Sequence, residues 1–357
     1  MLYLVPALLP ASFFALWSLL RHSEFAVLAS ADLYAWLPLV MLYGVIPLAD
    51  FVIGKDPHNP DDDEVAMLSD QPFYKVLLYA NVPIAFASLA FGLLLFIYWR
   101  DLSLLGQIGL ILSFGVVHAG IMINAAHELI HRRSAFEQRL GGILLSLVLY
   151  PSFKIEHVRG HHVNVATPED ASTSRYGQTL YHFLARAPYR NVTAAWRLEA
   201  KLLARRGLPV LSRHNELLRW YALSVIVMVA CTLVFGLPGL VFFMAQALVS
   251  IGVLETVNYL EHYGLERQKL PNGRYERTDH HHSWNSNYLL SNLITFQLQR
   301  HSDHHAHPQR HYQVLRHFDD SPQLPAGYPL MILLAMVPPL WMRVMNPRVE
   351  RYYRHNE

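Results

Sequence analysis

The stretch Leu298-Gln-Arg-His-Ser-Asp-His-His-Ala-His307 places three histidines at helical spacing near the C-terminal end of the chain. If the segment is helical, His301, His304 and His305 stand at i, i+3 and i+4 and share one face. Three neutral imidazoles on one face form most of the ligand set of a transition metal. A solvated histidine-rich loop is the alternative, and the rest of the chain argues against it.

The composition indicates a membrane protein. The 357 residues are 53% hydrophobic and 16% charged, whereas soluble domains carry about 25% charged residues. The single cysteine, Cys231, excludes an internal disulfide, an iron–sulfur cluster and a cysteine-based zinc site. The segment 2–20 lacks a basic leader and is followed by more apolar segments, so we interpret it as a first helix and not a cleavable signal. A net charge of +2 gives no indication of a nucleic-acid partner.

Six segments are apolar over about the 20 residues that cross roughly 30 Å of hydrocarbon. We predict transmembrane helices at 2–20, 33–53, 73–99, 104–126, 218–235 and 240–260. The predicted fold class is therefore all-α, a polytopic membrane protein with one membrane-embedded domain, 1–357, and a histidine-rich cap formed by 127–217 and 261–357. A further apolar segment, 328–345, is broken by Pro338-Pro339 and is expected to be interfacial or re-entrant.

Six spans place both termini and both long polar segments on one side of the membrane. That side holds most of the arginine and lysine, and the positive-inside rule makes it the cytoplasm. Every histidine cluster falls there, at helix ends or in loops. We therefore expect a multi-pass protein of the bacterial inner (cytoplasmic) membrane with its active site at the cytoplasmic face.

Nine histidines in four clusters are the candidate metal ligands. They are His127, His131, His157, His161, His162, His262, His301, His304 and His305. In an α-helix His157 and His161 share a face, whereas His162 is turned by about 100° and can serve a neighbouring metal. A mononuclear site uses three or four protein ligands, so nine suit two metals, each with a position left open. Imidazole binds zinc, copper, iron and nickel alike, so the ligand type does not name the metal.

Three carboxylates stand beside these histidines in the sequence: Glu156, Glu261 and Asp303. Each is expected to accept the second N–H of a ligand ring and so to fix its orientation.

Two other functions fit part of this pattern. His127-Glu128-Leu-Ile-His131 matches the H-E-x-x-H pattern of zinc metalloproteases, in which Glu128 would be the general base. That reading leaves the remaining clusters unexplained. A metal transporter places its ligands near the bilayer midplane, whereas these clusters lie outside the predicted spans.

Four motifs together resemble the integral-membrane alkane 1-monooxygenases of the membrane desaturase–hydroxylase superfamily. The motifs are His127-Glu-Leu-Ile-His131, Glu156-His-Val-Arg-Gly-His-His162, Asn258-Tyr-Leu-Glu-His-Tyr-Gly264 and Leu298-Gln-Arg-His-Ser-Asp-His-His-Ala306. The first two also fit desaturases, and the last two separate alkane-type hydroxylases from them. Weaker similarity runs through Ala166-Thr-Pro-Glu-Asp170 and His281-His-Ser-Trp-Asn-Ser-Asn287, so the resemblance covers nearly the whole chain.

The resemblance implies two non-haem irons held by the nine histidines, with O2 as co-substrate. It implies electrons from rubredoxin, recharged by a reductase from NADH or NADPH, and conversion of the terminal methyl of a medium- to long-chain n-alkane to a primary alcohol. Some relatives carry a fused rubredoxin, which needs four cysteines; this chain has Cys231 alone. No catalytic residue beyond the metal ligands is expected. A related hydroxylase or desaturase of an alkyl-benzene, a fatty acid or a terpene remains the alternative.

The substrate is expected to reach the metals through a narrow channel among the second, fourth and sixth helices. The resemblance adds that bulk on the second helix can limit chain length in this family. Leu42, beside Tyr43-Gly44, is the candidate gate of the channel. A packing or lipid-facing leucine is the alternative.

Overall fold

The computed structural model describes residues 2–23 and 30–356, and the predicted turn between the first two spans includes 24–29, which lie outside the described residues. Within the described ranges the structure contains helices and isolated β-bridges but no β-strand. The prediction of an all-α polytopic membrane protein is thereby confirmed.

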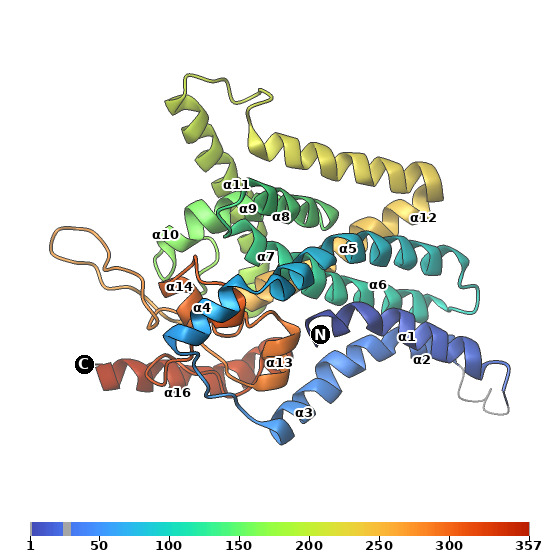
Figure 1. Cartoon of the computed structure of the whole chain (residues 1–357), viewed down its shortest axis with the longest axis horizontal. Coiled ribbons are helices and arrows are strands. Elements are labelled where there is room, and N and C mark those ends of the chain that lie inside the picture. Colours follow the sequence, from blue (N-terminus) through green and yellow to red (C-terminus); the bar gives the residue numbers. More distant parts are fainter. Residues whose placement is uncertain (1, 24–29, 357) are drawn as a thin grey trace. The chain divides into compact units, whose positions relative to one another are not determined.

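The chain divides into two compact units, whose helices are labelled in Figure 1. Unit 1 comprises Met1–Leu48, Pro72–Pro151 and Leu218–Val253, and unit 2 comprises Ala49–Gln71, Ser152–Leu217 and Leu254–Glu357. The helices of unit 1 are α1 (Val5–Leu20), α2 (Ala31–Val40), α5 (Pro72–Tyr98), α6 (Leu104–His118), α7 (Asn124–Ile130), α8 (Ala135–Leu147) and most of α12 (Glu216–Glu261). A 3-10 turn, Leu2–Leu4, precedes α1, two π-helical segments, Met41–Val45 and Ala119–Ile123, continue α2 and α6, and α3 (Ile46–Ile53) extends from the first of them into unit 2.

The helices of unit 2 are shorter, apart from two. They are α4 (Asp62–Asp70), α9 (Ser152–Glu156), α10 (His162–Asn164), α11 (Leu180–Arg205), α13 (Leu289–Ile294), α14 (His301–Ala306), α15 (Tyr328–Ala335) and α16 (Pro338–Asn356). A third π-helical segment, His157–His161, joins α9 to α10, and a 3-10 turn, Tyr312–Val314, follows α14.

The predicted spans correspond to long apolar helices. Among the described residues, five segments have the length and composition to cross a membrane: Leu2–Leu20, Ala31–Ile53, Pro72–Tyr98, Leu104–Ile130 and Glu216–Glu261. The last of these, α12, has 46 residues and would be about 69 Å long if straight, which is enough for two passes. It contains both the predicted fifth and the predicted sixth span.

A single glycine breaks α12 between these two spans. Gly236 has φ 67° and ψ −161°, a conformation that other residues rarely adopt, and Pro238 follows it. Figure 1 shows the two halves of α12 as separate rods that meet at a bend. The segment around Pro338-Pro339 is also bent, by 119°, as expected for an interfacial or re-entrant pair of helices.

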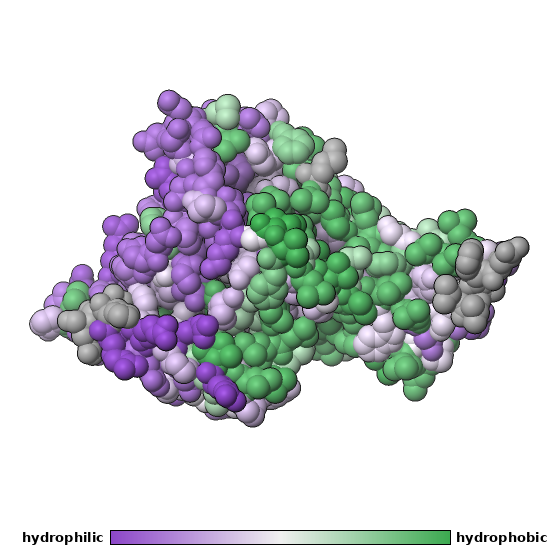
Figure 2. All heavy atoms as spheres, turned by 90° about the horizontal axis from the view of Figure 1, so that it is seen from below, coloured by the Kyte–Doolittle hydropathy of each residue, from purple (hydrophilic) through white to green (hydrophobic). Residues whose placement is uncertain are grey.

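A broad part of the face seen in Figure 2 is apolar, and unit 1 carries many exposed apolar side chains, as membrane insertion requires. Leu19, Leu104 and Leu233 are 73%, 74% and 82% exposed. Burying such surface in lipid is favourable by about 25 cal/mol per Å², whereas water would penalise it. The helices of unit 1 are therefore built for contact with hydrocarbon.

Within unit 1 the helices pack through glycines that face aromatic rings. A Cβ atom at Gly109 would lie 2.4 Å from Trp36 Nε1, and one at Gly142 would lie 2.5 Å from the ring of Trp220. Small residues at such positions let helix backbones approach closely, which is how membrane helices gain packing energy.

In unit 2 the amphipathic helix α11 supports the segment that carries three of the candidate ligands. Its buried Asn191 bonds Ser152 Oγ at 2.7 Å and Glu156 Oε2 at 3.2 Å. Its buried Glu199 accepts a hydrogen bond of 2.8 Å from Arg159 Nη1. These contacts fix α9 and the π segment against α11, because both groups are buried and fully engaged.

Candidate metal centre

Four buried histidines of unit 2 converge through their ring nitrogens. One nitrogen from each of His161, His262, His301 and His305 lies within 4.8 Å of the others. The Nε2 atoms of His161 and His305 are 3.2 Å apart, and those of His305 and His301 are 2.9 Å apart. We call this set the four-histidine group.

The spacing of these nitrogens fits a bound transition metal. At a metal–nitrogen distance of about 2.0–2.1 Å, two neighbouring ligands of one metal lie about 3.0–3.4 Å apart. In addition, His262 Nε2 is buried and has no hydrogen-bond partner in the described part of the chain. A buried polar atom without a partner is costly, and a metal ligated at this nitrogen would remove that cost.

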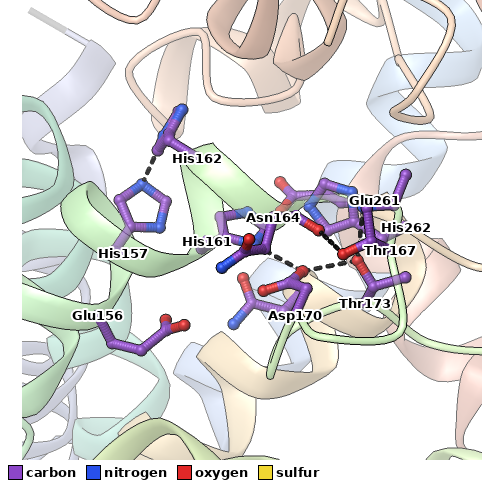
Figure 3. A network of polar contacts seen from close by, with 12 residues as sticks. Glu156, His157, His161, His162, Asn164, Thr167, Asp170, Thr173, Glu261 and His262 are labelled. Atoms are coloured by element: carbon purple, nitrogen blue, oxygen red, sulfur yellow. Dashed lines mark hydrogen bonds and ion pairs between the residues drawn. The ribbon is translucent and has the colours of Figure 1, made fainter. Parts of the chain in front are cut away.

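Three further histidines of unit 2 form a second convergence, the three-histidine group. His162 Nε2 lies 3.1 Å from His157 Nε2 and 3.1 Å from His304 Nε2. Figure 3 shows the His157 and His162 rings pointing toward each other from the π segment and the start of α10. These distances match the same ligand spacing.

The remaining pair, His127 and His131, lies in unit 1 at the end of the fourth span. Both side chains are buried, and their ring centroids are 5.2 Å apart, as expected for i and i+4 on one helix face. Between them in sequence, Glu128 forms a buried ion pair of 2.5 Å with Arg132.

Which histidines group together differs from the α-helical expectation. Because His157–His161 is a π-helical segment with i→i+5 hydrogen bonds, His157 aligns with His162 and not with His161. His161 instead belongs to the four-histidine group, although its ring still stacks on that of His157 at 5.1 Å.

The C-terminal trio is divided as well. His301 and His305, four residues apart on α14, belong to the four-histidine group, whereas His304 belongs to the three-histidine group. The expectation that all three would serve one face of one site was therefore wrong. The short helix α14 thus presents its i and i+4 histidines to one histidine group and its i+3 histidine to the other.

Asp170 holds the ring of His161, and sequence reasoning missed it. Its Oδ2 lies 2.9 Å from His161 Nδ1 and accepts a 2.6 Å hydrogen bond from Thr173 Oγ1 (Figure 3). Burial alone would raise the pKa of Asp170, but the His161 charge and hydrogen bond and the Thr173 hydroxyl lower it below its ordinary value. The ionised carboxylate thus favours a proton on Nδ1 of His161, which would leave Nε2 available to a metal. Asp170 ends the stretch Ala166-Thr-Pro-Glu-Asp170, whose weaker similarity to the family could have identified it.

Burial also keeps two of the candidate ligands, His262 and His305, in the form that can bind a metal. Burial, together with the neighbouring charge of His161, lowers the pKa of His262 to about 3. Burial and the surrounding imidazoles lower the pKa of His305 well below its usual value. Both rings are therefore neutral at physiological pH and offer a lone pair.

Of the three predicted orienting carboxylates, one contacts a candidate ligand directly. Glu261 Oε2 lies 3.2 Å from His301 Nε2, and its Oε1 accepts a 2.7 Å hydrogen bond from the Tyr328 hydroxyl. Glu261 therefore faces the nitrogen that points into the four-histidine group, and not the second nitrogen as expected. It is an oxygen donor at the edge of that group.

The contacts of the other two carboxylates are with different residues. Glu156 accepts from Asn191, and burial, with the nearby charges of Asp170 and Glu255, raises the pKa of Glu156 well above its ordinary value. Asp303 accepts from Arg310 Nη1 at 2.5 Å, from His307 Nδ1 at 2.9 Å and from the Arg316 amide at 2.8 Å. Asp303 thus ties α14 to the segment that follows it.

The candidate channel residue Leu42 is buried, at 8% exposure, in the π segment Met41–Val45 of unit 1. It is therefore not a lipid-facing side chain. Outside the nine candidate ligands, His280, His281 and Asp320 form a third, partly exposed group, in which His280 Nε2 lies 3.1 Å from Asp320 Oδ2.

Comparison with known proteins gives a consistent set of relatives. A family model described as "Fatty acid desaturase" matches residues 102–335. Alkane 1-monooxygenase 2 of Pseudomonas aeruginosa is 51% identical over 91% of this chain and 86% of that protein. Alkane 1-monooxygenase 2 of Alcanivorax borkumensis is 50% identical over 90% of this chain and 84% of that protein. The xylene/toluene monooxygenase hydroxylase component XylM of Pseudomonas putida is 28% identical over 66% of this chain and 63% of that protein.

Proposed function

The chain belongs to the alkane 1-monooxygenases within the fatty acid desaturase family, and from this premise we propose that it hydroxylates the terminal methyl group of n-alkanes. The reaction consumes one alkane, one O2, two electrons and two protons, and it yields one primary alcohol and one water. Rubredoxin supplies the electrons, and a reductase recharges it from NADH or NADPH. The convergence of buried, neutral imidazoles in the four-histidine group is the observation that carries this proposal.

The nine histidines are proposed to hold two non-haem irons, which supply the oxidising power by activating O2. The four-histidine group would bind one iron, the three-histidine group would bind the other, and His127 and His131 are the remaining two ligands. The chain itself contributes ligation and orientation: Asp170 fixes the proton of His161 on Nδ1, and burial keeps His262 and His305 neutral. The oxidising power resides in the metals, so no side-chain nucleophile is required.

We propose that the protein acts as one membrane-embedded domain in the bacterial inner membrane, with the histidine groups at the cytoplasmic face. The apolar surface of unit 1 suits a substrate that is dissolved in lipid. The zinc-protease alternative is disfavoured because Glu128, its required general base, is buried in an ion pair with Arg132.

Metal analysis with product analysis tests the proposed function. Purified protein should contain about two irons per chain, because nine ligands suit two sites. Removing the metal with a chelator should abolish alcohol formation, and ferrous iron should restore it while zinc should not. The assay is elemental analysis with gas chromatography of alcohols formed with rubredoxin and its reductase. Full activity with stoichiometric zinc would contradict the proposal, and oxidation of methylbenzenes in place of alkanes would reassign the substrate.

The channel proposal predicts that Leu42→Trp shifts the product profile towards shorter alkanes. The indole would fill part of a channel a few ångströms wide. Each methylene of the alkane that is no longer buried in the channel loses about 0.8 kcal/mol of favourable burial free energy, which corresponds to about fourfold in relative rate. Gas chromatography of alcohols formed from an equimolar C6–C16 mixture measures the shift.

Leu48→Trp is the matched control for Leu42→Trp, because Leu48 lies on the following helix and is 68% exposed. It should leave the profile unchanged. An unchanged profile in iron-loaded Leu42→Trp protein would place the gate elsewhere.

A further inference from the structure

Unit 2 contains a further group of possible ligands, His280, His281 and Asp320, and none of them is among the nine candidate iron ligands. One ring nitrogen from each histidine and one carboxylate oxygen lie within 4.8 Å of one another. His280 Nε2 is 3.1 Å from Asp320 Oδ2, which matches the spacing of about 3.0–3.4 Å between neighbouring ligands of one zinc ion. We call these three residues the surface group.

Two members of the surface group are held in a form that suits a metal. The ring of Phe318 stacks on that of His280, with centroids 4.5 Å apart and an interplanar angle of 20°, and so fixes the ring whose Nε2 faces Asp320. Partial burial would raise the pKa of Asp320, but the hydrogen bond and charge of His280 and the charge of His281 lower it below its ordinary value. Asp320 is therefore an anionic oxygen donor beside two imidazoles.

Tyr352 of α16 orients the ring of the third member, His281. The Tyr352 hydroxyl lies 2.7 Å from Nδ1 of His281 and donates to the backbone carbonyl of the same residue at 3.4 Å. A hydroxyl group has one hydrogen, so its oxygen accepts the hydrogen bond from Nδ1–H of the ring. The second ring nitrogen, Nε2, then keeps the lone pair that a metal requires.

The donor set and its exposure indicate which metal the surface group would take. Two imidazoles and a carboxylate are a ligand set of zinc, with water in the fourth position, whereas calcium and magnesium prefer oxygen ligands alone. The side chains of His280 and Asp320 are 24% and 65% exposed, so water has access to them. His161 and His262 of the four-histidine group are fully buried. A metal on the surface group would therefore exchange with solution more readily than one among the buried histidines.

We propose that the surface group is a third metal site of this chain, which takes one exchangeable zinc ion on His280 Nε2, His281 Nε2 and a carboxylate oxygen of Asp320. This site goes beyond the proposed function, which uses the nine other histidines. A hydrogen bond between His280 and Asp320 without any metal is the competing explanation of their contact, and the experiment separates the two.

A zinc ion in this place would join segments of unit 2 that are far apart in sequence. It would tie the segment 266–282 to the loop of Asp320 and, through Tyr352, to α16. The first of these segments continues into Ser283, whose Oγ lies 3.3 Å from Nδ1 of His262 in the four-histidine group. The ion would thus restrain the stretch of chain that contacts this candidate iron ligand.

The test is calorimetric titration of iron-loaded, tag-free protein in nanodiscs with zinc chloride, with elemental analysis of iron before and after. We expect wild type to bind about one zinc per chain without losing iron. His280→Ala and Asp320→Asn should each raise the Kd for zinc at least about tenfold, because affinity depends on the number of ligands. Asp319→Asn is the matched control, since Asp319 is the exposed neighbour of Asp320 and pairs with His317. It should stay within about twofold of wild type.

Hydrogen–deuterium exchange gives a second readout: zinc should slow exchange within 266–282 in wild type and leave it unchanged in Asp320→Asn. Three outcomes would overturn the site: wild type that binds no zinc, a zinc Kd that neither His280→Ala nor Asp320→Asn changes, and zinc that only displaces iron mole for mole. None of these measurements depends on catalysis. Protein that binds zinc as expected but forms no alcohol when loaded with iron would refute the proposed function and leave the zinc site standing.

Discussion

Replacing His305 with alanine should remove one iron per chain and reduce alcohol formation by at least 100-fold. His305 Nε2 lies 2.9 Å from His301 Nε2 and 3.2 Å from His161 Nε2, so its ring is central to the four-histidine group. Losing this ring removes one candidate ligand. The other imidazoles of the group stay buried and can form hydrogen bonds only with one another. The measurement is iron per chain by elemental analysis, together with alcohol yield.

The control is His22→Ala, because His22 is exposed and lies outside every histidine group. It should retain both irons and full activity. The same loss is expected for alanine at any of the other eight candidate ligands. Full activity in iron-loaded His305→Ala protein would refute the assignment of the four-histidine group as a metal site.

Replacing Asp170 with asparagine should weaken iron binding by about 10–100-fold, the usual cost of losing the partner of a ligand histidine. The amide has nearly the shape of the carboxylate but no charge. It therefore no longer stabilises the Nδ1–H form of His161, which the 2.9 Å contact defines in the native protein. Titration of metal-free protein with ferrous iron, followed by single-turnover alcohol yield, measures the effect.

Glu169→Gln is the matched control for Asp170→Asn, since Glu169 is the exposed neighbour of Asp170. It should bind iron like the wild type. If Asp170→Asn binds iron as tightly as Glu169→Gln does, the carboxylate merely packs against the ring.

Much of the fold could be predicted from the sequence because hydrocarbon imposes a simple rule. An apolar run of about 20 residues has few alternatives to a membrane helix. The break at Gly236 was also readable, since Gly236-Leu-Pro-Gly239 combines a residue that tolerates positive φ with one that cannot continue a helix. The fourth helical segment continues to Ile130, past the predicted span 104–126, which agrees with the expectation that His127 and His131 stand at i and i+4 where the helix leaves the apolar run.

The candidate site was predictable in composition but not in arrangement. Histidine clusters at helix ends identify the candidate ligands, but they do not show which of these histidines lie close together. The grouping of His157 with His162 depends on a π-helical segment, and no simple sequence pattern predicts such a segment. Asp170 reaches His161 through a loop, so helical spacing could not connect the two. Glu261 was identified by its adjacency to His262, but it contacts His301, which is distant in sequence.

The π segment at His157–His161 constrains how this chain can be aligned and redesigned. Because each residue of an α-helix advances the next side chain by about 100°, deleting Val158, Arg159 or Gly160 would turn the rings of His161 and His162 away from the groups that they now join. Such a deletion would keep all nine histidines in the sequence and still leave each group with a mismatched set of nitrogens. The spacing within this motif therefore determines which histidines group together. A gap at this point of a sequence alignment indicates that the histidines are grouped differently.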